Sequence, residues 1–71
     1  MHLSEGIIGN AYTIESIHLP DQLQHRLEAI GMTNGTPITV LNQKGNGILI
    51  IRLRETRFAL GRNITKNIVV R

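Results

Sequence analysis

The stretch RLEAIGMTNGTPITVL, residues 26–41, contains the end of a helix, a turn and the start of a strand. Leu23, Leu27 and Ile30 recur at the spacing of one helical face, so an apolar stripe leads into this stretch. Gly31 comes directly after the stripe, and glycine readily takes the left-handed conformation that ends a helix. The sequence therefore predicts a helix that ends at Gly31.

Two residues mark the start of this helix. Pro20 suits the first helical turn, where its missing N–H has no partner to lose. Asp21 places a negative charge near the positive end of the helix dipole. These residues predict that Pro20 lies in the first turn of the helix.

After the helix, the chain turns and enters a strand. Met32 carries the apolar stripe past the glycine, and Asn34 with Gly35 forms a strong turn pair. Pro37 is tolerated here because a proline is accepted among the first residues of a strand. We therefore expect Gly31, Asn34 and Gly35 to be the structural turn residues of the chain.

Two hairpins account for most of the remaining sequence. In the first, a two-residue turn at residues 45–46 connects PITVLNQ to ILIIRLR. This register pairs Val40 with Ile51. Further along the same ladder it pairs Ile38 with Leu53.

In the second hairpin, a turn at residues 55–56 connects ILIIRLR to RFALG. This register pairs Leu53 with Phe58 and Ile51 with Leu60. Both hairpins then place Leu49, Ile51 and Leu53 on one inward face. A slip of one residue would bury arginines instead, which is costly.

Three further segments complete the predicted fold. NAYTIESI is a first strand whose Tyr12, Ile14 and Ile17 face the core, RNITKN forms one helical turn with Ile64 inward, and IVVR is the last strand. Residues 1–71 are thus expected to form a single, mainly β domain. It is a small, partly open barrel of about five strands in which one helix lies between the first two strands and the last four strands form a meander.

Composition limits what such a domain can do. The chain has 71 residues, no cysteine and a net charge of +3. No disulfide or thiolate chemistry is available, and a core of this size leaves little room for a deep catalytic cleft. No secretory or membrane-spanning pattern is visible, so we expect a cytoplasmic protein without membrane insertion.

At the level of motifs, the sequence resembles the FeoA family. The stretch quoted above fits the family pattern R-L-x-x-[LIM]-G-[LM]-T-x-G-x-x-[IV]-x-[VIL], and ILIIRLRETRFALG, NIVV, LSE and Gly9 add to the likeness. The resemblance implies an SH3-like barrel and an accessory role in bacterial ferrous-iron uptake. It also implies binding to the cytoplasmic GTPase part of the FeoB membrane transporter. Two alternatives stay open: a small basic barrel that binds RNA, and a stand-alone relative of the C-terminal domain of metal-dependent repressors.

The residues themselves give little sign of catalysis or of a metal site. The acidic side chains are dispersed, and neither serine lies in a nucleophile-elbow context. His2, His18 and His25 are the only histidines, and no two are spaced i, i+4 on one helix face. We therefore expect no enzyme activity, no cofactor and no stable metal site in a single chain, although the family is commonly described in terms of transition metals.

A protein partner is the remaining expectation. Stacking of nucleic-acid bases needs exposed aromatic side chains, and the only two aromatic residues are Tyr12 and Phe58, the latter assigned to the core. The predicted first hairpin, in contrast, turns Leu41 and Ile50 outward and opposite each other. An apolar patch with a basic rim is typical of interaction surfaces. The candidate partner-binding residues are Leu41, Ile48, Ile50, Arg52, Arg54 and Arg57, and weak self-association is an alternative to a transporter partner.

Overall fold

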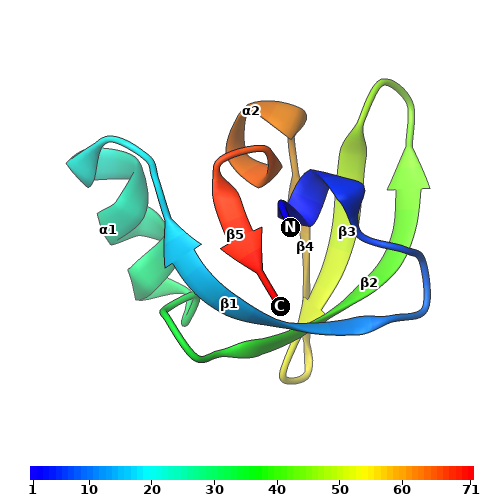
Figure 1. Ribbon diagram of the computed structural model, residues 1–71, viewed down its shortest axis with the longest axis horizontal. Coiled ribbons are helices and arrows are strands. Elements are labelled where there is room, and N and C mark those ends of the chain that lie inside the picture. Colours follow the sequence, from blue (N-terminus) through cyan, green and yellow to red (C-terminus); the bar gives the residue numbers. More distant parts are fainter.

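The computed structural model describes residues 1–71, and its main feature is one strongly curved antiparallel sheet. The strand order is β4-β3-β2-β1-β5, and Figure 1 shows the sheet bending around the interior while α1 lies at one side. This mainly β architecture, with a helix between the first two strands, is the fold class that the sequence predicts. The elements are η1 (Leu3–Glu5), β1 (Ala11–Ile17), α1 (Asp21–Ala29), β2 (Pro37–Lys44), β3 (Ile48–Leu53), β4 (Thr56–Leu60), α2 (Arg62–Thr65) and β5 (Ile68–Val70).

The last strand does not continue the meander, which corrects the sequence-based topology. β5 pairs with β1 instead of β4, because the single turn of α2 reverses the chain and returns it across the open side of the sheet. The N-terminal segment then covers the outer edge of β5. The N–H of Val70 donates to the carbonyl of Met1 at 2.7 Å, and His2 forms a bridge with Val69.

The end of α1 has the geometry of a Schellman motif. The N–H of Gly31 donates to the carbonyl of Glu28, and the N–H of Met32 donates to that of Leu27, both at 2.9 Å. Gly31 has φ = 97°, a conformation that costs a residue with a Cβ atom free energy. Leu27 and Met32 are both buried, so the motif also joins the helix to the core.

Two details of the predicted helix are wrong. Pro20 is the N-cap residue instead of a member of the first turn, and its carbonyl accepts a hydrogen bond from Gln24 at 3.0 Å. Ile30 is 37% exposed although the apolar spacing placed it on the core face. The reason is that the chain leaves the helix at Ile30, and Met32 takes the core position that another turn of helix would have given to this stripe.

The β2–β3 hairpin has a longer turn than predicted and a bulge that compensates for it. Lys44 pairs with Ile48, which leaves three residues in the turn instead of two. A register shift at Leu41 then restores the predicted pairing of Val40 with Ile51. The predicted pairing of Leu41 with Ile50 is wrong, because Ile50 lies opposite Asn42.

The β3–β4 hairpin is shifted by two residues from the predicted register. Its turn is Arg54-Glu55, and Leu53 pairs with Thr56 instead of Phe58. The β-branched Thr56 thereby becomes the first residue of β4, a position that suits its strand preference. A shift of two residues does not change which face a side chain occupies, so the predicted inward face is retained.

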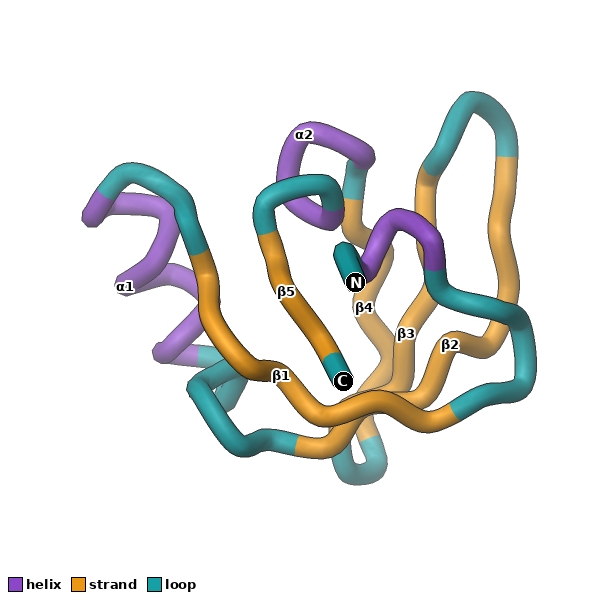
Figure 2. Tube along the Cα trace, viewed as in Figure 1, coloured by secondary structure: helices purple, strands orange, loops and turns teal.

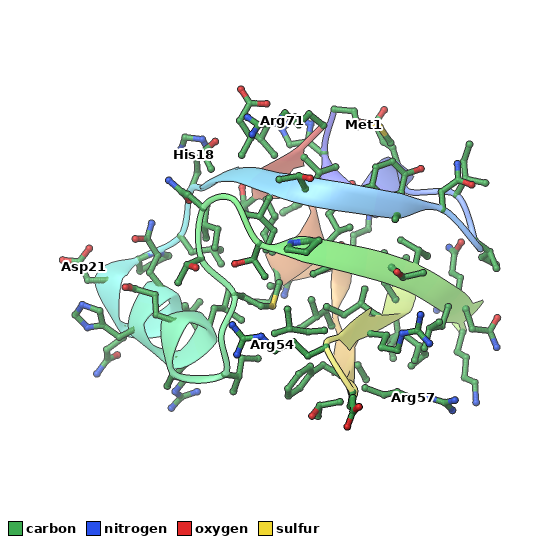
Figure 3. All side chains as sticks on the ribbon, turned by 90° about the horizontal axis from the view of Figure 1, so that it is seen from below. Met1, His18, Asp21, Arg54, Arg57 and Arg71 are labelled. Atoms are coloured by element: carbon green, nitrogen blue, oxygen red, sulfur yellow. The ribbon has the colours of Figure 1, made fainter.

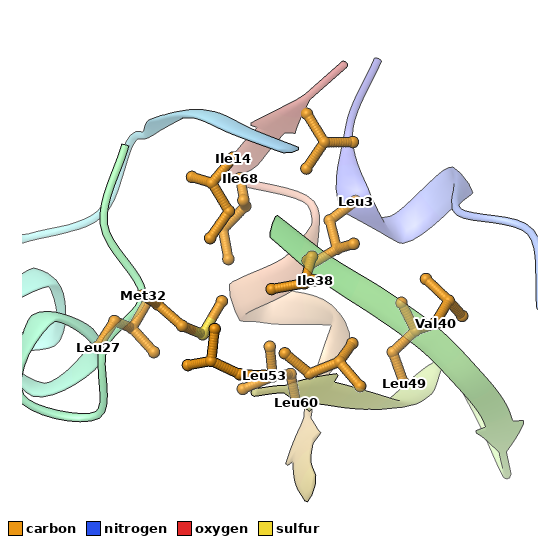
Figure 4. Close-up of a cluster of buried hydrophobic side chains, with 12 residues drawn as sticks. Leu3, Ile14, Leu27, Met32, Ile38, Val40, Leu49, Leu53, Leu60 and Ile68 are labelled. Carbon is orange, nitrogen blue, oxygen red and sulfur yellow. The ribbon is translucent and has the colours of Figure 1, made fainter. Parts of the chain in front are cut away.

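The core fills the inside of the curved sheet (Figure 4). Tyr12, Ile14 and Ile17 all pack on it, and a bulge in β1 after Ile14 explains the spacing of three residues between the last two. Leu3 is fully buried, a contribution that the sequence analysis missed. The apolar core residues are Leu3, Ile14, Leu27, Met32, Ile38, Val40, Leu49, Ile51, Leu53, Leu60, Ile68 and Val70.

Candidate functional site

A hollow of about 420 Å³ lies on the outer face of the β2–β3–β4 sheet. We call it the outer-face hollow. β3 contributes an isoleucine, β4 an arginine, and β2 the other three residues. The lining residues are Leu41, Asn42, Lys44, Ile50 and Arg57.

The bulge in β2 gives this hollow its lining. Val40 is fully buried and points into the core, as its pairing with Ile51 requires. The extra residue then lets both Leu41 and Asn42 line the outer face, where regular alternation would allow only one of the two. Leu41 and Ile50 are half-buried, so the hollow has an apolar part within a polar sheet surface.

The rim of the hollow is positively charged. Arg52 lies directly opposite Arg57 in the β3–β4 ladder, and both side chains are exposed. The only salt bridge in the structure joins His2 to Glu5, so neither arginine has a carboxylate within salt-bridge distance. Like charges placed directly opposite each other across two strands repel. An anionic group that binds between them would relieve this repulsion.

The structure separates the six predicted partner-binding residues into three locations. Leu41, Ile50 and Arg57 line the hollow, and Arg52 stands beside Arg57. Ile48 is 43% exposed and lies near the β2–β3 turn, outside the lining residues.

Arg54 occupies the third location. It lies in the β3–β4 turn, and its Nη1 is 3.8 Å from the position that a Cβ atom would take on Gly31. Figure 3 shows Arg54 toward α1 and Arg57 pointing away from it. Arg54 is therefore not part of the outer-face hollow.

Sequence reasoning missed two residues of the hollow, Asn42 and Lys44. Lys44 lies opposite Ile48 on the outer face, whereas regular alternation from the buried Val40 would turn it inward, so its position depends on the bulge in β2. Asn42 depends on the bulge, for which the sequence carries no local signal such as a strand glycine.

A second, more polar hollow of about 350 Å³ lies between the end of β1, α1 and the loop after it. Its lining residues are Ser16, Ile17, Gln24, Glu28, Met32, Thr33 and Asn34. The Gln24 side-chain amide donates to the carbonyl of Ile17 at 2.7 Å and so joins the helix to the strand.

The residues present do not assemble a set of metal ligands. No group of three or more histidine, cysteine, aspartate or glutamate side chains lies together. His2 and Glu5 form one pair, 3.7 Å apart, on the surface. His18 Nε2 is 2.8 Å from the hydroxyl of Ser16. Zinc sites in proteins usually take three or four protein ligands, and these pairs supply at most two side chains each.

None of the helices is long and apolar enough to span a membrane.

Solved structures of similar proteins share this fold. The crystal structure of an iron uptake regulatory protein, FeoA, has a TM-score of 0.84 at 30% identity and covers 97% of this chain and 90% of its own. The crystal structure of Stenotrophomonas maltophilia FeoA complexed with zinc, described as a prokaryotic SH3 domain protein, has a TM-score of 0.84 at 29% identity. That match covers 100% of this chain and 89% of the relative.

A protein with lower sequence identity shares the same fold. A manganese-dependent transcriptional repressor has a TM-score of 0.86 at 18% identity, over 96% of this chain and 39% of the repressor chain. This likeness shows the fold alone. Among curated proteins, none matches the chain. The model of the FeoA domain family matches residues 1–71, and the chain therefore belongs to the FeoA family, which is linked to ferrous-iron transport.

Proposed function

We propose that this protein is a non-enzymatic accessory component of ferrous-iron uptake that acts by binding the cytoplasmic GTPase part of a FeoB-type membrane transporter. Family membership supports the link to iron transport, and the zinc-complexed relative is described as a candidate activating factor for that process. The observation that carries the proposal for this chain is the outer-face hollow with its unpaired basic rim.

The chemistry of the hollow suits a protein surface better than a small substrate. Covering a half-buried Leu41 or Ile50 contributes at most about 1.5–3 kcal/mol per side chain before the costs of association. The exposed Arg52 and Arg57 add attraction for an acidic surface and increase the rate of encounter. The shallow lining contains no acid–base pair that would serve catalysis.

Ile50→Glu is the direct test. The side chain lies on the outer face, so the variant is expected to fold, while a carboxylate in the hollow would lose its hydration on binding. We expect its affinity for the purified GTPase domain, measured by calorimetry, to fall by about tenfold or more. Circular dichroism and thermal unfolding would establish that the variant is folded.

Ile30→Glu is the matched control, since it introduces the same charge at an isoleucine on α1 that is 37% exposed. It should bind like the wild type. Equal losses in both variants would assign the effect to net charge. Full binding by a folded Ile50→Glu protein would remove the outer-face hollow from the interface.

A further inference from the structure

The outer edge of β4 has backbone groups without partners. β4 is the terminal strand of the sheet and pairs only with β3. The two-residue turn makes Leu53 and Thr56 a hydrogen-bonded pair, and such pairs alternate along an antiparallel ladder. The N–H and C=O groups of Arg57 and Ala59 therefore point away from β3. No backbone or side-chain hydrogen bond outside the ladder involves any residue of β4.

The opposite edge of the sheet is different, because the N-terminal segment covers it. Met1 and His2 lie along β5 and bond to it. β4 has no proline and no bulge, and its only charged residue is Arg57. Prolines, bulges and several charged side chains are the features that usually keep a sheet edge from pairing with another chain. β4 is therefore an edge that is open to one more strand.

The side chains beside this edge determine which strand would fit. An added strand places alternate residues on the outer face, next to Arg57 and Ala59. The residue between them lies next to the half-buried Phe58 on the inner face. Arg57 and its neighbour Arg52 have no carboxylate partner, so an acidic residue is favoured beside Arg57.

Ala59 provides the second requirement. It is exposed, it pairs with Ile50, and it separates the open edge from the hollow. Its small side chain leaves room for a larger apolar side chain to extend across it toward Ile50 and Leu41, which line the hollow. On a strand added antiparallel to β4, the residue opposite Ala59 precedes the residue opposite Arg57, so the favoured sequence is two apolar residues followed by an acidic residue.

We propose that β4 binds an extended, acidic-apolar segment of a partner protein by strand addition. The backbone of this segment bonds to Arg57 and Ala59, its carboxylate lies beside Arg57 on the side away from Arg52, and its apolar side chain extends over Ala59 toward the outer-face hollow. This inference deepens the proposed function and rests on it only for the identity of the protein that supplies the segment.

The first test uses a synthetic peptide and does not depend on the transporter. The probe is acetyl-Thr-Leu-Val-Glu-Thr-amide, titrated into ¹⁵N-labelled protein. We expect saturable shifts of the Arg57 and Ala59 amides. A peptide with lysine in place of glutamate, and one N-methylated at the glutamate and leucine amides, should each bind about tenfold more weakly or worse.

Variants of Ala59 make the test specific to the edge. The N–H of Ala59 points outward and makes no ladder bond to β3. Ala59→Pro removes this N–H, and proline is tolerated on edge strands. It should keep the fold and lose peptide binding, while Ala59→Ser should retain it. Absence of shifts at β4 up to the solubility limit, or equal binding by folded Ala59→Pro, would overturn the inference.

Two further outcomes separate this inference from the proposed function. If the GTPase domain binds Ala59→Pro normally but not Ile50→Glu, the proposed function stands and strand addition is wrong. If sedimentation shows a dimer of the free protein that Ala59→Pro abolishes, the strand comes from a second copy, and the choice of an acidic partner is overturned.

Discussion

Gly31 shows how one residue determines where a helix ends. Its φ of 97° would cost alanine about 1–2 kcal/mol. Space is not the obstacle, since a Cβ atom there would meet Leu53 Cδ2 at 3.4 Å, an ordinary contact. We therefore expect Gly31→Ala to lower the free energy of unfolding by about 1–2 kcal/mol, measured by denaturant titration.

Gly61 provides the control for this substitution. Its φ is −71°, and an added Cβ atom would meet nothing within 4 Å. Gly61→Ala should leave stability unchanged or raise it slightly, because alanine restricts the unfolded chain. Equal losses in both variants would show that the cost does not come from the left-handed conformation.

The β3–β4 turn also contains a residue in the left-handed conformation, and its cost can be measured within this element. Arg54 is the only non-glycine residue with positive φ, at 58°. Arg54→Gly relieves the backbone but also removes a charge beside the end of α1. Arg54→Ala removes the same charge and keeps the strain. The glycine variant should therefore be more stable than the alanine variant by about 1 kcal/mol in denaturant unfolding. Equal stabilities would mean that the turn tolerates this φ at no cost.

Elements with strong local signals were predictable from the sequence. α1 follows from its apolar spacing and from the glycine after it. The inward face of β3, with Leu49, Ile51 and Leu53, follows from Arg52 and Arg54, which the opposite face assignment would bury. The register of β4 was not predictable, because Arg54-Glu55 and Glu55-Thr56 are equally plausible turns by residue type. Face assignment survived this error because it depends only on whether the shift is even or odd.

At the scale of the whole molecule, features that depend on contacts between residues far apart in the chain could not be predicted from the sequence. β5 lies beside β1, more than fifty residues away in the chain, and nothing local to its three residues selects that neighbour. Leu3 enters the core for the same reason, since η1 packs against β5. The hollow was predicted only in part, because its shape depends on the bulge at Leu41.

Charge distribution is the property of the whole molecule that bears most directly on association. The net charge is +3, and the outer-face hollow carries Lys44 and Arg57 with no acidic partner in contact. Arg57→Glu changes the net charge by two units at this rim. We expect it to slow association with the GTPase domain, and the difference from the wild type should shrink as salt increases. Stopped-flow measurements at several salt concentrations would determine both effects.

Arg71→Glu makes the same change in net charge at a different place. Figure 3 shows Arg71 on the opposite side of the molecule from Arg57, and its side chain is exposed. If the local field of the hollow steers the partner, Arg71→Glu should associate nearly as fast as the wild type, because charges separated by more than about 10 Å are largely screened at moderate salt. If both variants slow association equally, net charge alone governs encounter and the rim has no special role.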